Sequence, residues 1–464
     1  MSARTDRASE HHAPPSDSPT SRWAVRLGPP FLLAVLVALA FGNAVVDSFA
    51  YDDEAFVPIP HPPGESGWET TGRLFREDVW AAMRHHNTAY RPLSMATLVL
   101  DDRLWGGDRR GFHLTSVLLH LLATLALYYL LLGLLRARPP PTTAGEAARG
   151  SSSTWVPALV AAAMFAVHPI HTEAVDSVFN RAELLATLAV LCSLLLVWYL
   201  EPRRRGLCWA LVAVLYLAAL FFKESAATLP LLACLLLLFF RAGPTAGATL
   251  RRCLPAVAVC AVLGLYFVLR HLLFTRAVEP LPPAGTLGEG LALTLTGLRD
   301  NLLLILWPHP LRAVRTDYVA EAVPLAAVLA AALVALVVVA RRRARGLAFG
   351  LAFFLVALLP VTRLITRLVH AQPMAERYLY LPSVGLAVAL AFGVRWLWGR
   401  VPRLPVVAAA VVLVGVLTPL TRARNAEWHD SATLFRAEVA AGPANGDALF
   451  LCGWHGQETG GEPM

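Results

Sequence analysis

The stretch LGPPFLLAVLVALAFGNAVV, residues 27–46, contains no charged side chain and is followed shortly by Tyr51-Asp52-Asp53-Glu54. An apolar helix of about 20 residues is long enough to cross the ~30 Å hydrocarbon core of a bilayer. The acidic residues therefore stand where the first helix leaves the membrane. Carboxylates at that boundary are costly unless they are solvated, paired or functional, so the pattern indicates chemistry where lipid meets water.

The composition is that of a membrane protein with many spans. The chain has 464 residues, of which 56% are hydrophobic and 16% charged, whereas soluble domains carry about 25% charged residues. The net charge is +8, but the basic residues fall in short clusters between apolar runs, which is the positive-inside pattern and argues against a nucleic-acid partner. These clusters are Arg136/Arg138, Arg203–Arg205, Arg251/Arg252 and Arg341–Arg345. The six cysteines show neither zinc-ligand spacing nor a disulfide pattern, and we expect no metal site from them.

Eleven apolar runs are candidate spans. A further apolar stretch, Leu287–Trp307, contains Arg299 and Asp300, and we expect it to lie on the outer surface or to be re-entrant. This choice puts every Arg cluster on the cytoplasmic side, with the N-terminus inside and the C-terminus outside. The eleven runs are Leu27–Val46, Phe112–Leu135, Trp155–Val167, Ala182–Leu200, Leu207–Phe222, Ala226–Phe240, Leu254–Leu273, Val323–Ala340, Leu347–Ile365, Leu379–Trp398 and Leu404–Leu420.

The sequence predicts an all-α polytopic membrane protein in three parts. Residues 1–26 form a disordered cytoplasmic leader, residues 27–421 the transmembrane domain, and residues 422–464 an extracytoplasmic tail. Amphipathic helices are expected on the outer face, because Gly72–Trp105 alternates polar and apolar residues and is broken at Arg91-Pro92.

The first candidate site is the acidic pair. Adjacent carboxylates such as Asp52 and Asp53 can act as a general base or can hold a cation. The alternative is a solvated loop that caps the following turn.

The second candidate follows the third apolar run. His168, His171 and Glu173 could bind a metal ion, or a phosphate could pair with Arg181. No third His or Cys is spaced to complete a metal site, and the alternative is that these residues cap helix ends at the interface.

Two further charged pairs stand on the outer side. Lys223-Glu224 either tethers two helices or belongs to a site for an anionic headgroup. Glu376-Arg377 follows a loop rich in cations, which runs against the positive-inside bias. A bound phosphate would account for these cations, and salt bridges between loops are the alternative. The other cations of this loop are Arg363, Arg367 and His370.

Taken together, these blocks resemble the transmembrane and tetratricopeptide-repeat family of protein O-mannosyltransferases. The resemblance runs in order from about Phe41 to Asn445. The matching residues are Tyr51-Asp52-Asp53, Tyr90-Arg91-Pro92-Leu93, Phe112-His113, Leu118-Leu119-His120, Phe165 to Val175 with His-Pro-Ile-His-Thr-Glu at its centre, Asn180 to Leu184, Lys223-Glu224, Glu376 to Pro382, Arg424-Asn425, Trp428 and Leu434-Phe435.

The resemblance implies a GT-C glycosyltransferase fold, a polyprenyl-phosphate-linked sugar donor and transfer outside the cytosol. In such enzymes an acidic residue of the first outer loop acts on the acceptor, which here is Asp52 or Asp53. The lipid-linked sugar is a substrate, so no cofactor is implied, and a divalent metal stays open as an alternative. The candidates for contact with the donor phosphate and sugar are His168, His171, Glu173, Arg181, Lys223, Glu224, Glu376 and Arg377.

The tail departs from the family pattern of a long repeat array. Phe435–Asn445 could begin one helical repeat, but Gly453–Met464 is rich in Gly and has no repeat pattern. A lone repeat cannot bury its faces, since stable arrays need about three or more. The sequence therefore predicts a vestigial or truncated repeat and leaves the mode of acceptor recognition open.

We hypothesise that the protein moves a sugar, mannose by resemblance, from a lipid phosphate to Ser or Thr hydroxyls of an acceptor protein. Its membrane would be the bacterial inner membrane or, in a eukaryote, the endoplasmic reticulum membrane. One alternative is a lipid or solute transporter or flippase, which predicts ionisable residues in mid-span and an inverted repeat. The sequence has few such charges and no obvious repeat. Another alternative is an inactive membrane scaffold for docking partners.

Overall fold

The computed structural model of the protein describes residues 19–57, 59, 64–77, 89–137, 154–274, 286–313, 322–362, 375–443 and 445–458, with the backbone alone for 19–26 and 456–458. Every regular element in this part of the chain is a helix. The prediction of an all-α polytopic membrane protein is confirmed. Arg138, Arg363, Arg367, His370 and residues 1–18 lie outside the described residues.

Eight helices among the described residues are long and apolar enough to cross a membrane. A ninth candidate is a pair bent by 54°, α7 (Trp155–Ala166) followed by Pro169–Asp176, and two shorter apolar helical segments are Glu224–Phe240 and Arg345–Val361. Together these eleven segments match the eleven apolar runs of the sequence. The eight are α1 (Pro19–Phe41, apolar over Leu27–Ala44), α5 (Arg109–Arg136), α9 (Arg181–Tyr199), α10 (Arg205–Phe222), α12 (Ala246–Phe274), α14 (Val323–Arg343), α16 (Tyr380–Trp398) with the 3₁₀ turn Glu376–Leu379, and α17 (Arg403–Glu427).

The helix α13 (Leu287–Leu306) is not among the candidate spans. It begins with a capping box, in which the Thr286 hydroxyl accepts from the Glu289 N–H at 3.2 Å and the Glu289 carboxylate accepts from the Thr286 N–H at 2.7 Å. Its two charged residues, Arg299 and Asp300, pair with each other at 2.6 Å. This placement is consistent with the expectation that the stretch does not span.

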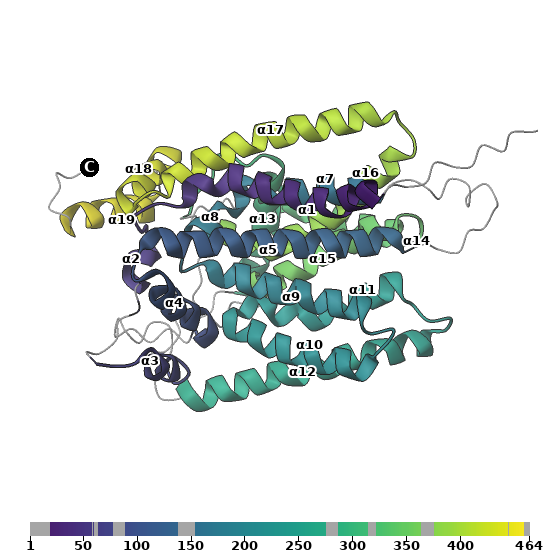
Figure 1. The fold of residues 1–464 in the computed structure, drawn as a ribbon, viewed down its shortest axis with the longest axis horizontal. Helices are drawn as coiled ribbons and strands as arrows, with labels where there is room; N and C mark the ends of the chain where they lie inside the picture. Colours follow the sequence, from purple (N-terminus) through teal and green to yellow (C-terminus); the bar gives the residue numbers. More distant parts are fainter. Residues whose placement is uncertain are drawn as a thin grey trace, which may run out of the picture.

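The long helices form a bundle whose axes run mostly along the longest dimension of the molecule (Figure 1). The short helices of the first loop and of the tail gather at one end of this bundle, at the left of Figure 1, which we call the site end. They are α2 (Asp52–Phe56), α3 (Gly67–Leu74), α4 (Pro92–Trp105), α18 (Ser431–Ala441) and α19 (Gly446–Glu458). Segments from the two ends of the chain therefore meet in space.

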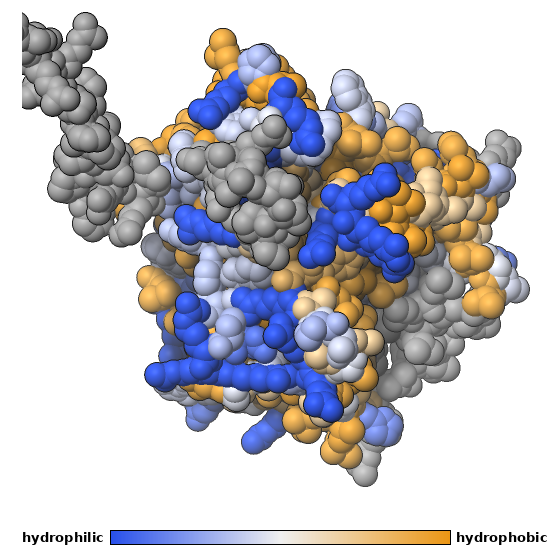
Figure 2. All heavy atoms as spheres, turned by 90° about the vertical axis from the view of Figure 1, so that its right-hand side faces the viewer, coloured by the Kyte–Doolittle hydropathy of each residue, from blue (hydrophilic) through white to orange (hydrophobic). Residues whose placement is uncertain are grey.

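The opposite end, which we call the arginine end, carries the loops before α10, α12, α15 (Arg345–Leu358) and α17. Its clusters contact one another, since an Arg205 Nη donates to the Arg251 carbonyl at 2.7 Å and an Arg252 Nη to the Arg241 carbonyl at 2.7 Å. Figure 2, which looks onto this end, shows hydrophilic side chains surrounded by apolar ones. The arginine clusters thus share one end of the bundle, as the positive-inside pattern requires.

A helix begins directly after the break predicted at Arg91-Pro92, whereas residues 78–88 of the predicted helix pair lie outside the described residues. Local chemistry explains the start and end of α4 and the start of α5. Pro92 is the first residue of α4, where its missing N–H costs nothing. Gly106 ends α4 with a φ of 61°, in the left-handed conformation that favours glycine. The Asp108 carboxylate then caps α5 by accepting from the Arg110 N–H at 3.0 Å.

Two glycines bring α15 and α16 into backbone contact. A Cβ on Gly350 would lie 2.4 Å from the Gly385 carbonyl oxygen, and a Cβ on Gly385 would lie 2.5 Å from that of Gly350. Small residues allow this approach between helices in membranes. The contact fixes α16, which directly follows the 3₁₀ turn that carries Glu376 and Arg377.

Candidate functional site

The acidic pair begins in a strained turn. The Asp53 N–H donates to the Ala50 carbonyl at 3.2 Å, and Tyr51 between them has φ 56° and ψ −125°. These angles are those of the first central residue of a type II′ turn, a position that normally requires glycine. A non-glycine residue held there costs of order 1–3 kcal/mol and persists only when its surroundings enforce it. Asp52 is the next residue and the first of α2.

Both carboxylate oxygens of Asp53 accept hydrogen bonds from other residues of the protein. Its side chain is 1% exposed, and its two oxygens accept from the Ser177 hydroxyl at 2.9 Å, the Val178 N–H at 2.7 Å and the Phe179 N–H at 2.8 Å. Burial raises the pKa of Asp53 to about 7, although the hydrogen bonds from these three donors act to lower it. Asp53 therefore fastens α2 to the turn that precedes α9.

Asp52, by contrast, is partly exposed, and its carboxylate forms no hydrogen bond or ion pair with any residue that the structure describes. Burial among its neighbours raises its pKa, whereas the charge of Arg377 lowers it, Glu173 raises it, and Arg91 and Lys223 lower it. The structure thus brings one available carboxylate close to three cations. We call Asp52, Arg91, Lys223 and Arg377 the open cluster.

Arg377 is oriented by Glu173. The Arg377 N–H donates to one Glu173 oxygen at 2.8 Å, and its guanidinium pairs with the other. Glu173 is fully buried, whereas the Arg377 side chain is 12% exposed. The guanidinium carbon lies 5.1 Å from the centre of the Tyr378 ring, and the aromatic face adds a cation–π contact. Glu173 therefore does not contact the exterior but fixes the direction in which Arg377 points.

Lys223 is held in the same manner. Its Nζ lies 2.9 Å from Glu183, whose second oxygen accepts from the Ser225 hydroxyl at 2.9 Å. The Nζ also lies 5.6 Å from the centre of the Tyr378 ring. Burial, together with the charges of Arg91 and Arg377, lowers the pKa of Lys223 to about 8, although Glu183 opposes the shift. The three cations are therefore close enough to repel one another.

Arg91 completes the open cluster. Its guanidinium pairs with Glu224 at 3.1 Å, and the side chains of this pair are 20% and 31% exposed. The Tyr266 hydroxyl donates to the Tyr90 carbonyl at 3.2 Å and ties this segment to α12. Each cation of the cluster thus pairs with a carboxylate that fixes its direction, and the exposed fractions of the three side chains are 20% for Arg91, 12% for Arg377 and 6% for Lys223.

The two histidines are placed away from this cluster. The His168 Nε2 donates to the Ile305 carbonyl at 3.0 Å and its Nδ1 accepts from the Ile170 N–H at 3.2 Å, which joins α13 to the 3₁₀ turn Pro169–His171. His171 is fully buried beside the Phe165 and Tyr380 rings, at centroid distances of 4.5 and 4.8 Å. The described contacts of both histidines are thus with α13, backbone groups and aromatic rings rather than with members of the open cluster.

Arg181 is also placed elsewhere. It is fully buried, forms an ion pair with Asp101, and donates to the Phe112 carbonyl at 2.8 Å. These contacts join the start of α9 to α4 and α5. The structure therefore gives Arg181 a role in holding helices together rather than one at an accessible surface.

Glu376 belongs to a second group, which we call the sealed cluster: Glu376, Arg424 and Glu438. Arg424 lies 3.8 Å from Glu376 and 3.1 Å from Glu438, and the three side chains are at most 4% exposed. The backbone N–H groups of Arg312 and Ala313 donate to Glu376 and Glu438, respectively. This cluster links α18 to the turn that carries Arg377.

Sequence reasoning missed several of these partners. Arg91 was visible only as part of the family motif, and its position directly before the proline that starts α4 was the available signal. Glu183 was visible as a lone acid at the start of an apolar run. Nothing in the sequence pairs Arg424 with acids on two other segments, because those contacts are tertiary.

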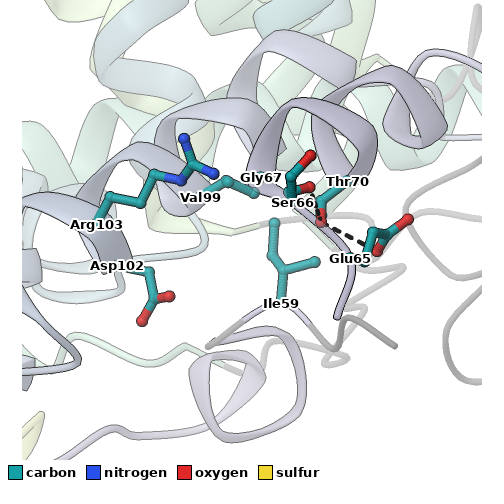
Figure 3. A pocket seen from close by; sticks show the side chains of 8 residues that line it. All are labelled: Ile59, Glu65, Ser66, Gly67, Thr70, Val99, Asp102 and Arg103. Atoms are coloured by element: carbon teal, nitrogen blue, oxygen red, sulfur yellow. Dashed lines mark hydrogen bonds between the residues drawn. The ribbon is translucent and has the colours of Figure 1, made fainter. Parts of the chain in front are cut away.

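A hollow of about 170 Å³ lies between α3 and α4 (Figure 3). One wall is fixed, because Glu65 accepts from the Thr70 hydroxyl at 3.0 Å and pairs with Arg73 at 3.2 Å. The hollow contains no residue of the open cluster. Its lining residues are Ile59, Glu65, Ser66, Gly67, Thr70, Val99, Asp102 and Arg103. In the described part of the chain, no group of three or more His, Cys, Asp and Glu side chains is placed to hold a metal ion.

Comparison with known proteins gives matches in one family. The chain is 32% identical over 167 residues to the human protein O-mannosyl-transferase TMTC1, which covers 35% of this chain and 17% of the relative. It is 32% identical over 253 residues to Drosophila melanogaster Tmtc2, covering 51% and 24%, and 26% identical over 209 residues to Caenorhabditis elegans F38B6.6, covering 44% and 27%. Both are named protein O-mannosyl-transferases. The family prediction is confirmed. The matched segments span between 17% and 27% of the length of these O-mannosyl-transferases.

No family model matches the chain, and no solved structure matches it. The GT-C arrangement of the bundle therefore stays a prediction.

Proposed function

We propose that this protein transfers a mannosyl group from a polyprenyl-phosphate carrier to a Ser or Thr hydroxyl of an acceptor protein, on the extracytoplasmic side of its membrane. The names of the relatives support glycosyl transfer to protein. The observation that carries the proposal is the open cluster, in which a carboxylate without a hydrogen-bond partner among the described residues lies near three oriented cations.

Asp52 acts as the general base in this reaction. A hydroxyl is a poor nucleophile at neutral pH, and a positioned carboxylate that accepts its proton contributes about 10²–10⁴-fold in rate. The hydroxyl oxygen forms a bond to the anomeric carbon of the sugar while its proton passes to Asp52. The bond from that carbon to the phosphate oxygen breaks, and the phosphate leaves with the electron pair. The raised pKa of Asp52 makes the carboxylate a better proton acceptor.

Arg91, Lys223 and Arg377 hold the phosphate and stabilise the charge that develops on it. Cations fixed in place before the reaction need no reorganisation when the charge appears, and guanidinium groups match phosphate oxygens in a bidentate manner. Glu224, Glu183 and Glu173 orient the three cations. The cluster is at the site end, where a carrier lipid could present its phosphate from the bilayer surface.

The side of the membrane follows from the arginine end. Lys and Arg accumulate in cytoplasmic loops, so the arginine end faces the cytoplasm and the site end faces outward. Cysteines introduced near Gly64 and Gly442 should react with a membrane-impermeant reagent in intact cells, whereas one near Gly346 should not. Labelling of the cysteine near Gly346 but not of the one near Gly442 would mean that the site end faces the cytoplasm, opposite to the proposed orientation.

The proposal is tested with the protein reconstituted in lipid vesicles, a polyprenyl-phosphate-mannose donor and Ser/Thr-containing acceptor polypeptides. Wild type should form a mannosylated product, and Asp52→Asn should lower the rate about 10²–10⁴-fold while donor affinity and unfolding temperature stay unchanged. If Asp52→Asn turns over at the wild-type rate, Asp52 is not the base. If wild type binds the donor but forms no product with any acceptor, a transferase role is excluded under these conditions and a docking role is favoured.

A further inference from the structure

The strained Tyr51 is held in place by the tail of the chain, more than 370 residues later in sequence. The Tyr51 N–H donates to the Ser431 hydroxyl of α18 at 2.9 Å. Its ring meets the Phe435 ring edge-to-face, with the centroids 6.0 Å apart. Three residues earlier, the Ser48 hydroxyl donates to the His429 carbonyl. The turn that presents Asp52 is therefore held on its backbone and on its side chain by one helix.

Local sequence does not favour this turn. Tyr at the first central position of a type II′ turn is in a region that only glycine adopts readily. Without the contacts to α18, residues 50–53 would relax toward conformations with negative φ at Tyr51. Such a change rotates the backbone immediately before Asp52, and a displacement of about 1 Å at a reacting group can cost on the order of 10²-fold in rate.

The same helix also reaches the cations. Glu438, on α18, accepts from the Ala313 N–H at 2.8 Å and pairs with Arg424. Arg424 pairs with Glu376, which directly precedes Arg377 of the open cluster. The Ser431 and Glu438 side chains are each 1% exposed, so these contacts are shielded from water. One short helix is thus linked to both the acid and one cation.

We propose that α18 is a positioning element of the active site, and that Ser431 and Phe435 hold the Tyr51 turn in the form that aims Asp52 at the acceptor. The kinetic part of this inference rests on the proposed function. The tail accordingly has a role beyond that of a vestigial repeat: whatever displaces α18 changes the rate of transfer. Ser431 and Phe435 do not touch the reacting atoms and act through Tyr51.

The matched variants Tyr51→Gly and Tyr51→Ala test the strain. Both remove the ring, and they differ mainly in whether a positive φ is easily adopted. Glycine normally makes a backbone more flexible than alanine does. If the loop had no positioning role, Tyr51→Ala would therefore keep a higher transfer rate than Tyr51→Gly. Positioning through the II′ turn predicts the reverse, with Tyr51→Gly several-fold faster than Tyr51→Ala in kcat.

Ser431→Ala tests the link to α18 without relying on activity. Hydrogen exchange followed by mass spectrometry should show faster exchange in the segment 50–54 and unchanged protection across α17. In the transfer assay kcat should fall about tenfold while the dissociation constant of the donor lipid stays the same. The control is Ser193→Ala, which removes another buried serine hydroxyl, one that donates to the Ala189 carbonyl of its own helix α9 at 2.8 Å. This variant should leave both readouts at wild-type values.

The outcomes separate the two proposals. Unchanged exchange of segment 50–54 in Ser431→Ala, or Tyr51→Ala matching or exceeding Tyr51→Gly, would overturn the positioning role of α18. If wild type transfers no sugar, the proposed function fails, but the exchange measurement still decides whether α18 holds the Tyr51 turn.

Discussion

The open and sealed clusters are built from the same residue types and share the site end, but they differ in what is left available. In the sealed cluster, Arg424 pairs with Glu376 and Glu438, and each of these carboxylates also accepts from a backbone N–H. In the open cluster each cation pairs with a different carboxylate, and the Asp52 carboxylate has no hydrogen-bond partner among the described residues. The sealed cluster is buried and paired, so it can only hold the fold. The open cluster contains the partly exposed Asp52, which can still accept a proton, beside cations that can bind an anion.

In two pairs of adjacent residues, one residue holds the fold and the other belongs to the open cluster. Asp53 fastens a turn while Asp52 remains accessible, and Glu376 joins the sealed cluster while Arg377 joins the open one. The holding residue of each pair is 1% exposed. Neighbouring side chains point in different directions, about 100° apart in an α-helix such as α2 and about 120° apart in a 3₁₀ turn such as Glu376–Leu379. One residue can therefore fix the backbone from which the next one acts.

The largest expected effect concerns the sealed cluster. Arg424→Met should destabilise the protein by about 3–5 kcal/mol, because it leaves two buried carboxylates without their cation. Thermal unfolding in detergent, followed by tryptophan fluorescence, would measure the loss. Arg403→Met, at an exposed position at the arginine end, is the control. An unfolding temperature equal to that of the control variant would mean that the cluster is not a stability element.

A smaller effect is expected in the open cluster. Arg91→Gln should weaken binding of the lipid-linked donor by roughly 1.5–3 kcal/mol, the usual value of a hydrogen bond to a charged group. Its partner Glu224 is 31% exposed and can be solvated by water, so the unfolding temperature should change little. Titration calorimetry with the donor in nanodiscs measures the affinity. The exposed Arg110, 3.8 Å from Asp47, gives the matched control Arg110→Gln; equal affinities for the two variants would remove Arg91 from the donor site.

The smallest expected effect is a pH dependence. Lys223 has a pKa lowered to about 8 by burial and by Arg91 and Arg377, so it is charged below that pH and loses its proton above it. A bound phosphate favours the charged form, and donor affinity should therefore fall as pH rises through about 8, by at most about tenfold per unit. Lys223→Arg should bind with a flat profile between pH 7 and 9.5, because arginine stays protonated. A flat wild-type profile would exclude Lys223 from phosphate contact.

The sequence allowed the fold to be predicted largely because its signals are local. Apolar length identifies each span, and Pro92 and Gly106 mark helix ends without reference to the rest of the chain. The two short segments were harder to classify, since a helix of 12 residues such as α11 (Leu229–Phe240) rises only about 18 Å. Its status as a span depends on what packs around it.

The sequence allowed the residues of the candidate site to be predicted, but not which of them contact one another. Whether Asp52 or Asp53 is available depends on a turn about 125 residues away, and the burial of Arg181 depends on Asp101. These contacts join segments that are far apart in the chain, and a single sequence does not reveal which residues will meet. The acidic pair could be identified from the sequence because carboxylates at a membrane boundary are costly unless they are solvated, paired or functional.

The central claim, that available groups act and saturated groups hold, is tested most directly by Asp52→Asn and Asp53→Asn measured side by side. Each variant needs a single-turnover transfer rate and an unfolding temperature from the same preparation. Asp52→Asn should lose about 10²–10⁴-fold in rate with its unfolding temperature unchanged. Asp53→Asn should lose roughly 1–3 kcal/mol of stability, since its amide would face backbone N–H donors, while each folded molecule keeps transferring. Loss of transfer in a stable Asp53→Asn protein, with Asp52→Asn at the wild-type rate, would contradict the account.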